Sequence, residues 1–416
     1  MKILQIVHQY PPQYVGGTEL YTQSLAQQWS ARGHTSHVLS RRSQEGSGWE
    51  KREVEGITIW DAWNGLATPT RRFMATFGDA VLSGAAEQLL DKTAPDLIHI
   101  QHLMGWPVAL LKAIKARAIP FVVTLHDYWW ICANAQLLTN YNPQICAGPE
   151  AYVNCARCAL ARSGVPHLWP AIPPLSGLLS WRSRLLREVL LAARSIIAPS
   201  HFVRTWYAAQ EPALGDKIQV IPHGIAYPGA KSTRVASSPV RFVYLGGLSW
   251  QKGVHVVVEA FQGLGGEAEL WIAGDESFDP GYARLLHDKA TPAVRFLGPL
   301  AHERIWEVLS QADALVVPSL WYETFSLVTR EAFAAGVPAI VSDLGALAEA
   351  VQEGVDGMRV PAGDVVAWRA ALQRVIREPE LRAHLREGVR PPLTLPEHVD
   401  RLEHLYLQCV DSKVSA

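Results

Sequence analysis

Two glutamates, Glu323 and Glu331, stand eight positions apart in the stretch PSLWYETFSLVTREAFAAGVPAIVSD, residues 318–343. Glu331 is embedded in apolar residues at the start of what reads as a buried helix. Because removing a charge from water is costly unless something pairs with it, buried carboxylates are rare. Glu331 can accept two hydrogen bonds from a vicinal diol such as a ribose, and Glu323 can meet a hydroxyl beyond it. The alternative is structural, with Glu331 paired to an arginine or a backbone amide and Glu323 a solvated loop residue.

The elements around these glutamates place them at the edge of a sheet. A strand is predicted over 314–318, a loop carries Glu323, and a helix follows over 328–335. In open parallel sheets, ligands bind outside the carboxyl ends of the strands. The first amides of the helix, near 326–329, would be free to bind an anion such as a diphosphate. The stretch therefore predicts a site for a ligand that carries both phosphates and hydroxyls.

Strands and helices alternate twice along the chain. The predicted strands are, in the first half, 2–7, 35–40, 97–101, 120–125 and 195–199, and, in the second half, 240–245, 269–273, 294–297, 314–318 and 339–342. Helices are predicted between them over 18–32, 254–261, 303–311, 328–335 and 365–377. Short apolar strands separated by helices favour parallel sheets covered on both faces. The expected fold class is α/β, with two doubly wound, Rossmann-like parallel-sheet domains that face each other across a cleft.

Domain boundaries follow from composition. The segment 223–239 is rich in proline, glycine and serine, as a junction between domains would be. We therefore expect one domain over residues 1–222 and a second over 223–393. The remaining residues, 394–416, include an amphipathic pattern over 396–410 that predicts a final helix.

Composition excludes several classes of protein. The chain has 416 residues, 49% hydrophobic and 19% charged, which is typical of a globular protein. A net charge of −1 gives no electrostatic footprint for nucleic acid. The apolar run at the N-terminus is too short for a signal peptide, and no run approaches the roughly 18 residues that span a bilayer. These observations predict a cytoplasmic protein.

Four segments together resemble glycosyltransferase family 4. FVYLGGLSWQKGVHVVVEAF (242–261) is similar to the strand, loop and helix that open the family's donor domain, and residues 318–343 match its paired-glutamate motif. IQVIPHGI (218–225) resembles its interdomain segment, and QYPPQYVGGTEL (9–20) resembles its first glycine loop. The resemblance extends from residue 1 to about residue 380. It implies the GT-B fold, with an acceptor-side first domain, a donor-binding second domain and a last helix that crosses back to the first.

The resemblance also assigns roles to particular residues. Glu331 matches the glutamate that binds the donor ribose, and Glu323 matches the one near the sugar ring. Lys252 matches the lysine on the diphosphate. In the first domain, His126 is at the place of a histidine that faces the donor sugar. The backbone around phosphate and sugar corresponds to Gly17, Phe325, Ser326, Leu327 and Val328.

Three of these residues have plainer readings. Lys252 would otherwise be a surface lysine, and His126 would only hold a loop through a backbone carbonyl. A Gly-Gly turn, here Gly16 and Gly17, is weak evidence when taken alone. The position of His126 at the end of a predicted strand favours a role in the site.

Two positions depart from the family pattern. The family usually has an arginine five residues before the lysine, as a second diphosphate clamp, and this chain has Gly247 there. Either donor binding is weaker, or another cation such as Arg330 replaces the arginine. His223 stands where asparagine is usual before Gly224, which a turn tolerates.

The resemblance implies a retaining, metal-independent hexosyltransferase. The donor would be a UDP- or GDP-sugar, and the acceptor a carbohydrate or a lipid-linked molecule in bacterial polysaccharide or glycolipid synthesis. The alternatives are a non-catalytic relative that binds a nucleotide or sugar, and an epimerase or phosphorylase of the same fold. Retention of both glutamates and Lys252 favours the enzyme.

Four of the five cysteines fall within 27 residues. Their spacing is C-x13-C-x8-C-x2-C, and in a cytosolic protein such a cluster favours a metal over disulfides. Four thiolates would make a closed structural zinc site that holds an excursion over 132–158. The alternative is four reduced thiols in a loop that packs by itself. The cysteines are Cys132, Cys146, Cys155 and Cys158.

The segment 165–194 mixes tryptophan, leucine and arginine. Such a helix suits the surface of a membrane, in a peripheral contact at its inner face near a lipid-linked acceptor. It equally suits a helix that covers the first domain with its leucines, and the need for a covering helix here favours that reading.

Overall fold

The computed structural model describes residues 1–229, 239–264 and 266–411, in two compact units. Unit 1 comprises Met1–Ile221 and His398–Ala416, and unit 2 comprises Pro222–Glu397. The sequence placed the boundaries after residues 222 and 393, so the two divisions differ by one and four residues. Most of the predicted junction 223–239, and the tail after residue 411, lie outside the described residues.

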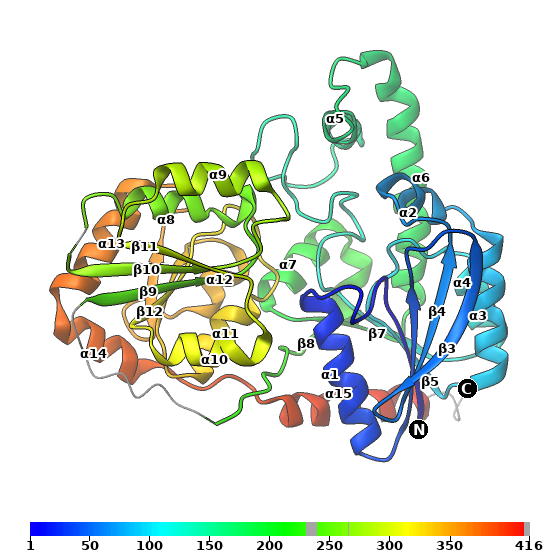
Figure 1. The fold of residues 1–416 in the computed structure, drawn as a ribbon. Helices are drawn as coiled ribbons and strands as arrows, with labels where there is room; N and C mark the ends of the chain where they lie inside the picture. Colours follow the sequence, from blue (N-terminus) through cyan, green and yellow to red (C-terminus); the bar gives the residue numbers. More distant parts are fainter. Residues whose placement is uncertain (230–238, 265, 412–416) are drawn as a thin grey trace. The chain divides into compact units, whose positions relative to one another are not determined.

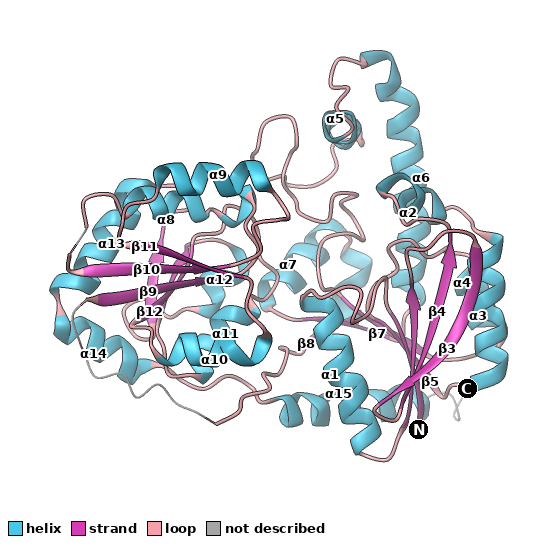
Figure 2. Ribbon diagram, viewed as in Figure 1, coloured by secondary structure: helices cyan, strands magenta, loops and turns pink. Residues whose placement is uncertain are grey.

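Unit 1 is built on an eight-stranded sheet in the order β3-β4-β2-β1-β5-β6-β7-β8 (Figure 2). All neighbours are parallel except β3 and β4. The strands are β1 Lys2–Ile6, β2 Thr35–Arg41, β3 Ser47–Val54, β4 Ile57–Asn64, β5 Leu97–Ile100, β6 Phe121–Thr124, β7 Ser195–Ala198 and β8 Ile218–Val220.

The hairpin at the edge of this sheet was not predicted. Glu55 and Gly56 join β3 to β4 and both have positive φ, 53° and 75°, as the tight turns that suit twisted hairpins require. β3 exposes most of its residues, so no apolar run marks it in the sequence. A solvated antiparallel edge strand on a parallel sheet is common in α/β proteins, so this hairpin adds to the predicted parallel-sheet fold without changing its class.

Helices lie between and after the strands of unit 1, and most of them pack on its sheet (Figure 2). They are α1 Gly17–Ala31, α2 Pro69–Ala75, α3 Ala80–Thr93, α4 Leu110–Ala116, α5 Val153–Arg162, α6 Ile172–Ala192, α7 His201–Gln210 and α15 Leu395–Asp411, with short 3-10 turns at Trp169–Ala171 and Pro212–Lys217. Each helix buries one face, and loops at the carboxyl ends of β1, β2, β5 and β6 carry the polar residues described below.

The last helix, α15, completes unit 1 although it comes after unit 2 in the chain. Tyr406 is fully buried, and its hydroxyl lies 2.5 Å from Nδ1 of His99 on β5. The Tyr21 hydroxyl of α1 lies 2.8 Å from Nε2 of His398. Arg32 pairs with Glu403, 2.9 Å away. The helix therefore supplies both apolar and polar contacts to the first strands and helix of the chain.

The cysteine-rich excursion ends in α5, which together with the N-terminal part of α6 stands away from the sheet of unit 1 (Figure 1). The C-terminal part of α6 buries Leu186, Val189 and Leu190, as a covering helix does. Trp169, in the 3-10 turn before α6, and Trp181, near the middle of α6, are exposed. The buried C-terminal part agrees with the reading of segment 165–194 as a covering helix. Among the described helices, none is long and apolar enough to cross a membrane.

Unit 2 contains a six-stranded sheet, entirely parallel, in the order β11-β10-β9-β12-β13-β14. Its strands are β9 Val240–Leu245, β10 Ala268–Ala273, β11 Val294–Gly298, β12 Ala314–Val317, β13 Ala339–Ser342 and β14 Gly357–Val360. Its helices are α8 Val254–Ala260, α9 Pro280–Lys289, α10 His302–Ser310, α11 Leu327–Ala334, α12 Gly345–Ala350, α13 Val365–Arg377 and α14 Pro379–Gly388. Apolar clusters lie on both faces of this sheet, as a doubly wound unit requires.

Candidate functional site

The carboxylate of Glu323 is almost fully enclosed by donors. It is 9% exposed and lies in the loop that follows β12. Oε1 accepts hydrogen bonds from Nζ of Lys252 at 2.8 Å and from Oγ of Ser319 at 2.8 Å. The indole of Trp321 donates a third at 3.0 Å, and the Lys252 ammonium lies 5.2 Å from the centre of the same ring. The sequence placed Lys252 and Glu323 in separate loops, and the structure brings these two residues together.

Gly253 allows the two loops to meet. It has φ +69°, and a Cβ there would lie 2.0 Å from the carbonyl oxygen of Pro318, so only glycine fits. Two residues earlier along the loop, the carbonyl of Gln251 accepts a hydrogen bond of 2.8 Å from the amide of Leu320. The loop after β9 is therefore fastened to the loop after β12, which holds Lys252 beside Glu323.

These contacts fix the charge state of Glu323. Burial alone would raise its pKa, but the Lys252 ammonium and the hydrogen bonds from Lys252, Ser319 and Trp321 outweigh burial and lower the pKa below its ordinary value. The carboxylate is therefore ionised at neutral pH, and it neutralises and orients the lysine.

Glu331 has a different environment. It lies on α11, and its side chain is 12% exposed. Among the described residues, neither carboxylate oxygen has a hydrogen-bond partner, and the one cation at ion-pair range is His302, whose Nε2 lies 3.9 Å from Oε1. Burial raises the pKa of Glu331, and His302 offsets only part of that rise. This carboxylate has the capacity to accept hydrogen bonds that the described chain does not use.

The helix that carries Glu331 begins without a side-chain cap. Ser326 is the N-cap residue, with φ 59° and ψ 79°, and it makes no capping bond to the backbone. Its hydroxyl instead lies 2.8 Å from that of Thr329. The first amides, at Leu327 and Val328, have no partner within a helix by construction, and the positive end of the helix dipole lies beside them. Phe325 is buried, and its ring lies 5.0 Å from that of His223.

Gly247 lies in the loop after β9, five residues before Lys252. A Cβ at this position would meet no atom within 4 Å, and the residue is not among the glycines of positive φ. The backbone therefore accepts a side chain here. Arg330, considered above as a replacement cation, has its guanidinium 5.1 Å from the centre of the Phe325 ring and within the electrostatic reach of Glu349 and Asp356.

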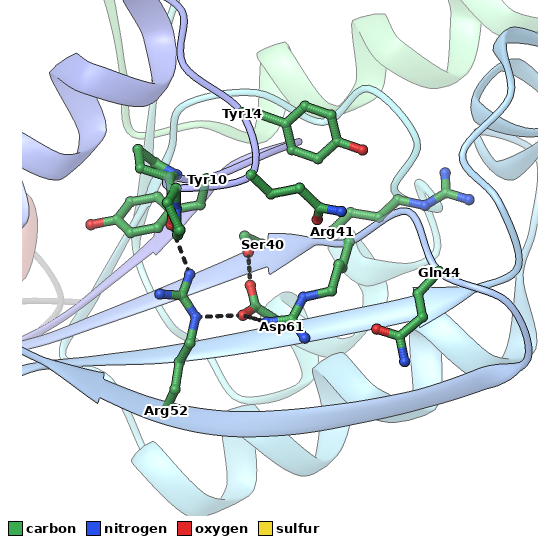
Figure 3. Close-up of a pocket in the computed structure, with 11 residues that line it drawn as sticks. Tyr10, Tyr14, Ser40, Arg41, Gln44, Arg52 and Asp61 are labelled. Atoms are coloured by element: carbon green, nitrogen blue, oxygen red, sulfur yellow. Dashed lines mark hydrogen bonds and ion pairs between the residues drawn. The ribbon is translucent and has the colours of Figure 1, made fainter. Parts of the chain in front are cut away.

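Unit 1 has a cavity at the corresponding edge of its own sheet, where β1 and β2 end (Figure 3). Its volume is about 480 Å³. On its floor the buried carboxylate of Asp61 accepts hydrogen bonds from Ser40, from Arg42 at 2.7 Å and from Arg52 at 2.7 Å. Arg41 also lines the cavity. Sequence reasoning missed this site because its residues come from β2, β3, β4 and two loops, and because the hairpin of β3 and β4 was not predicted.

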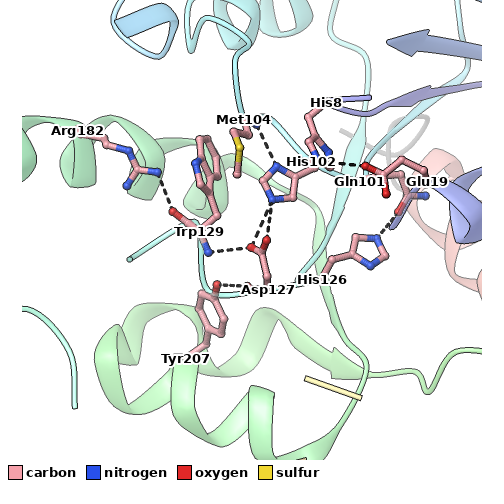
Figure 4. Close-up of polar contacts among 10 residues, drawn as sticks. All are labelled: His8, Glu19, Gln101, His102, Met104, His126, Asp127, Trp129, Arg182 and Tyr207. Carbon is pink, nitrogen blue, oxygen red and sulfur yellow. Dashed lines mark hydrogen bonds and ion pairs between the residues drawn. The ribbon is translucent and has the colours of Figure 1, made fainter. Parts of the chain in front are cut away.

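His126 follows β6, as predicted, and Gly17 is the first residue of α1. Nε2 of His126 lies 2.8 Å from the side-chain oxygen of Gln101, and its ring lies 5.0 Å from that of Tyr21 (Figure 4). A side-chain amide therefore helps to hold the imidazole at this edge of the sheet.

Four further titratable residues lie at this edge and were not predicted as site residues. Nε2 of His8 lies 3.3 Å from Glu19, and Nε2 of His102 lies 3.1 Å from Asp127. The two histidine rings are 4.5 Å apart. Burial, followed by the nearby His102 and Arg72, lowers the pKa of His8 well below its ordinary value, and burial raises the pKa of Glu19.

The sequence feature that could have identified these residues is their position just after predicted strands. His8, His102 and Asp127 each follow the end of a predicted strand by a few residues, as His126 does. Glu19 follows Gly16, where a Cβ would lie 2.6 Å from its carboxylate, so the glycine admits this side chain.

The four predicted zinc ligands are all in the described chain. Burial, with the neighbouring thiols as lesser causes, raises the pKa of Cys155 to about 12. Burial likewise raises the pKa of Cys158 to about 11, and its sulfur accepts a hydrogen bond of 3.2 Å from the amide of Asn140. Among the described residues, no group of three or more histidine, cysteine or acidic side chains is arranged to hold a metal ion. The side chains as placed do not fit zinc, and the zinc site stays a prediction.

Comparison with known families accounts for most of the chain. Residues 15–226, half of the sequence, match Glycosyltransferase Family 4, and residues 230–390 match Glycosyl transferases group 1. The chain therefore belongs to glycosyltransferase family 4, and it is a glycosyltransferase with the two Rossmann-like units of the GT-B fold.

Full-length relatives extend the comparison. Glycogen synthase of Mycobacterium tuberculosis is 28% identical over 414 residues, which cover 95% of this chain and 90% of that protein. D-inositol 3-phosphate glycosyltransferase of Acidothermus cellulolyticus is 24% identical and covers 90% of this chain and 80% of its own length. These relatives act on different acceptors by name, so the similarity defines the class of enzyme and not its substrates.

Solved structures share the fold. Sucrose-phosphate synthase from Thermosynechococcus elongatus superposes with a TM-score of 0.74 at 18% identity and covers 99% of both chains. Anabaena HepE in complex with UDP and glucose superposes with a TM-score of 0.67 at 17% identity, over 97% of this chain and 99% of that one.

Proposed function

We propose that the protein is a retaining hexosyltransferase that takes its sugar from a nucleotide-sugar bound at the carboxyl edge of the sheet of unit 2. The observation that carries the proposal is Glu331, a nearly buried carboxylate without a hydrogen-bond partner among the described residues, on a helix whose first amides are uncapped. A nucleoside diphosphate has complementary groups, since its ribose offers two hydroxyls and its phosphates are anionic.

The donor would lie along this edge with each part opposite a matching group. The ribose hydroxyls would donate to Glu331, and the diphosphate would meet the amides of Leu327 and Val328 and the ammonium of Lys252. Glu323, which already holds Lys252, would lie near the sugar ring. Because HepE is described in complex with UDP and glucose, a UDP-hexose is the first donor to test.

The chemistry follows from these assignments. Neither glutamate is assigned to attack on the anomeric carbon, so the bond to the diphosphate would break as the acceptor hydroxyl enters on the same face. Lys252 and the helix amides would stabilise the charge that develops on the leaving diphosphate. The acceptor proton would pass to a phosphate oxygen of that group.

Thermal unfolding with a panel of donors tests the proposal. UDP-, GDP- and ADP-sugars are added to the full chain, and a ligand at 100 times its dissociation constant should stabilise it by about 2.7 kcal/mol. Glu331→Gln should lose this response, whereas Glu307→Gln, on the surface of α10, is the matched control. If no nucleotide sugar stabilises the wild-type protein, the proposal is wrong.

For the acceptor we propose a carbohydrate or a lipid-linked molecule, bound by unit 1 on the side of His126. The exposed Trp169 and Trp181 would suit a peripheral contact with a membrane that carries such a lipid. Sedimentation with anionic vesicles measures this contact, and a Trp169→Ser/Trp181→Ser variant should bind them more weakly. Equal sedimentation of both proteins would exclude the contact.

A further inference from the structure

The charges that line the cavity of unit 1 do not cancel. Arg42 and Arg52 are both bound to Asp61, and Arg42 also pairs with Glu50 on β3. Two guanidinium groups therefore meet two carboxylates. Arg41, the third arginine of the cavity, is left outside this balance (Figure 3).

Arg41 is a buried cation that forms no ion pair within the part of the chain that the structure describes. It is 3% exposed, at the carboxyl end of β2, and its Nη1 donates a hydrogen bond of 2.9 Å to the carbonyl of Gly105. Its Nε is buried and has no hydrogen-bond partner among residues 1–229, 239–264 and 266–411. Among the described residues, no carboxylate forms an ion pair with it. Asp79 acts on it electrostatically, but that carboxylate caps α3 at Leu82 and accepts from Asn64.

A second arginine approaches the same place. Gly105 has φ +79°, and a Cβ there would lie 2.5 Å from Nη1 of Arg41 and 3.4 Å from Cγ of Arg72. Both side chains therefore pass over this glycine. Arg72, near the end of α2, makes no ion pair among the described residues. Its charge also reaches His8 and Glu19, which connects the cavity to the titratable residues at the ends of β1 and α1.

Such an arrangement is costly unless an anion completes it. A buried guanidinium is normally paired, and two adjacent cations repel each other. Burial together with the neighbouring arginines lowers the pKa of Arg41. Guanidinium groups bind phosphate and carboxylate through two parallel hydrogen bonds, which makes arginine suited to an oxyanion here.

We propose that this cavity binds an oxyanion, a phosphate or a carboxylate, carried by the acceptor of the transferase, with Arg41 and Arg72 as its cationic ligands. The assignment of this anion to the acceptor rests on the proposed function. The anion site itself rests only on the residues of unit 1. The cavity lies where β1 and β2 end, the edge at which open parallel sheets bind ligands. The substrate class would thus be a phosphorylated or acidic sugar, and Tyr14 and Gln44 at the rim would contact its uncharged part.

Calorimetry with four probes tests the anion site on the full chain: inorganic phosphate, glucose 6-phosphate, glucuronate and glucose. Glucose 6-phosphate or glucuronate should bind more tightly than glucose, and the better of the two identifies the anion. Arg41→Gln should weaken that binding about 10- to 100-fold, as expected for loss of charge-assisted hydrogen bonds. Arg117→Gln, which removes a surface ion pair with Asp91, should leave it unchanged.

Thermal unfolding without ligand separates a binding role from a structural one. If Arg41 is kept for an anion, Arg41→Gln should unfold at the same temperature or higher, because the variant no longer buries an unpaired charge. If Arg41 only holds Gly105, the variant should unfold earlier and anion binding by the folded protein should not change. That second result would overturn the proposal, as would equal affinity of the wild-type protein for all four probes.

One further pair of variants separates this site from the nucleotide site. Arg41→Gln should leave the binding of UDP unchanged, and Lys252→Gln should leave the binding of the anionic sugar unchanged. If no nucleotide binds but the anion still depends on Arg41, the anion site stands and the proposed donor is wrong. If both variants weaken the same ligand, the two sites are not independent and the proposal fails.

Discussion

Glu323 lies in the loop after β12, and Glu331 lies on α11, the helix that follows this loop. Both carboxylates are nearly buried, but they differ in their hydrogen-bond partners. Glu323 accepts three hydrogen bonds, one of them from an ammonium, and its pKa is lowered. Glu331 has no hydrogen-bond partner among the described residues, and its pKa is raised. The hydrogen bonds of Glu323 are already made in the protein without ligand, whereas Glu331 would gain hydrogen bonds only if a ligand supplied the donors.

The difference teaches how the work of a binding site is divided. A satisfied carboxylate fixes the geometry before any ligand arrives, which is a positioning role. An unsatisfied one is destabilising in the free protein and contributes when the ligand binds. Substitutions at the two positions should therefore change stability in opposite directions.

The largest effect is expected at Glu323. Glu323→Gln removes the counter-ion of Lys252, so the protein should lose about 2–3 kcal/mol of stability. Turnover should fall about 100-fold, because small displacements of a positioned group cost that much. Urea denaturation and steady-state kinetics measure the two quantities. A variant as stable as the wild type would show that the contacts of Glu323 do not hold the loops.

Glu331→Gln should do the reverse. It removes a buried charge that lacks a partner, so the free protein should be about 1 kcal/mol more stable. Nucleotide binding should weaken about 30- to 100-fold, because two hydrogen bonds from the ribose lose their charge. Titration with UDP and with a 2′-deoxy analogue checks this, since the variant should discriminate less between them. Unchanged affinity would remove the ribose assignment.

Gly247→Arg should add a contact without disturbing either glutamate. The loop has room for a side chain there, and a guanidinium on the diphosphate should tighten nucleotide binding about 10- to 100-fold. Calorimetry with the nucleoside diphosphate compares the variant with Gly247→Gln, which has similar reach and no charge. If the arginine variant folds and binds no better, another cation already serves the diphosphate.

A smaller effect is expected on the pH dependence of stability. The pKa of Glu331 is raised in the folded protein, so its contribution to the free energy of unfolding is fully present below the pKa of the unfolded state. That contribution is lost as pH rises through the pKa of the folded state. The pKa of Glu323 is lowered in the folded protein, so this residue stabilises the fold above the pKa of the unfolded state. That stabilisation is lost as pH falls through the pKa of the folded state. The advantage of Glu331→Gln over the wild type should therefore grow from pH 4 to pH 7. Denaturation at several pH values measures it, and a constant difference would contradict it.

Substitution of the cysteines should have the smallest effect on the site that contains Glu323 and Glu331. Their spacing predicts close to one zinc per chain, lost in a Cys155→Ser/Cys158→Ser variant, while nucleotide affinity stays unchanged. Metal analysis of protein purified without added zinc measures the content. A protein free of metal whose loop is stable would agree with the side-chain placement and refute the prediction.

Regular, apolar elements were predictable from the sequence, and contacts between loops were not. All ten predicted strands are present to within two residues at either end, because a short apolar run between turn residues reports burial on both faces. Four of the described strands, β3, β4, β8 and β14, were missed, and of these the exposed β3 and the three-residue β8 lack that signal. Lys252 and Glu323 were each identified, but their ion pair depends on Gly253 and a close approach across 71 positions of sequence. Arg41 gave no signal, since only the burial of its side chain makes it unusual.

The place of α15 has a consequence for how the protein is made. A ribosome releases the strands of unit 1 first, yet Tyr406 and His398, which contact His99 and Tyr21, emerge only after all of unit 2. The first unit to be synthesised is therefore the last to be completed, since its buried His99 and Tyr21 have partners 307 and 377 positions later in the chain. A released chain truncated after residue 397 should hold a folded unit 2 and an unfinished unit 1, which limited proteolysis would detect.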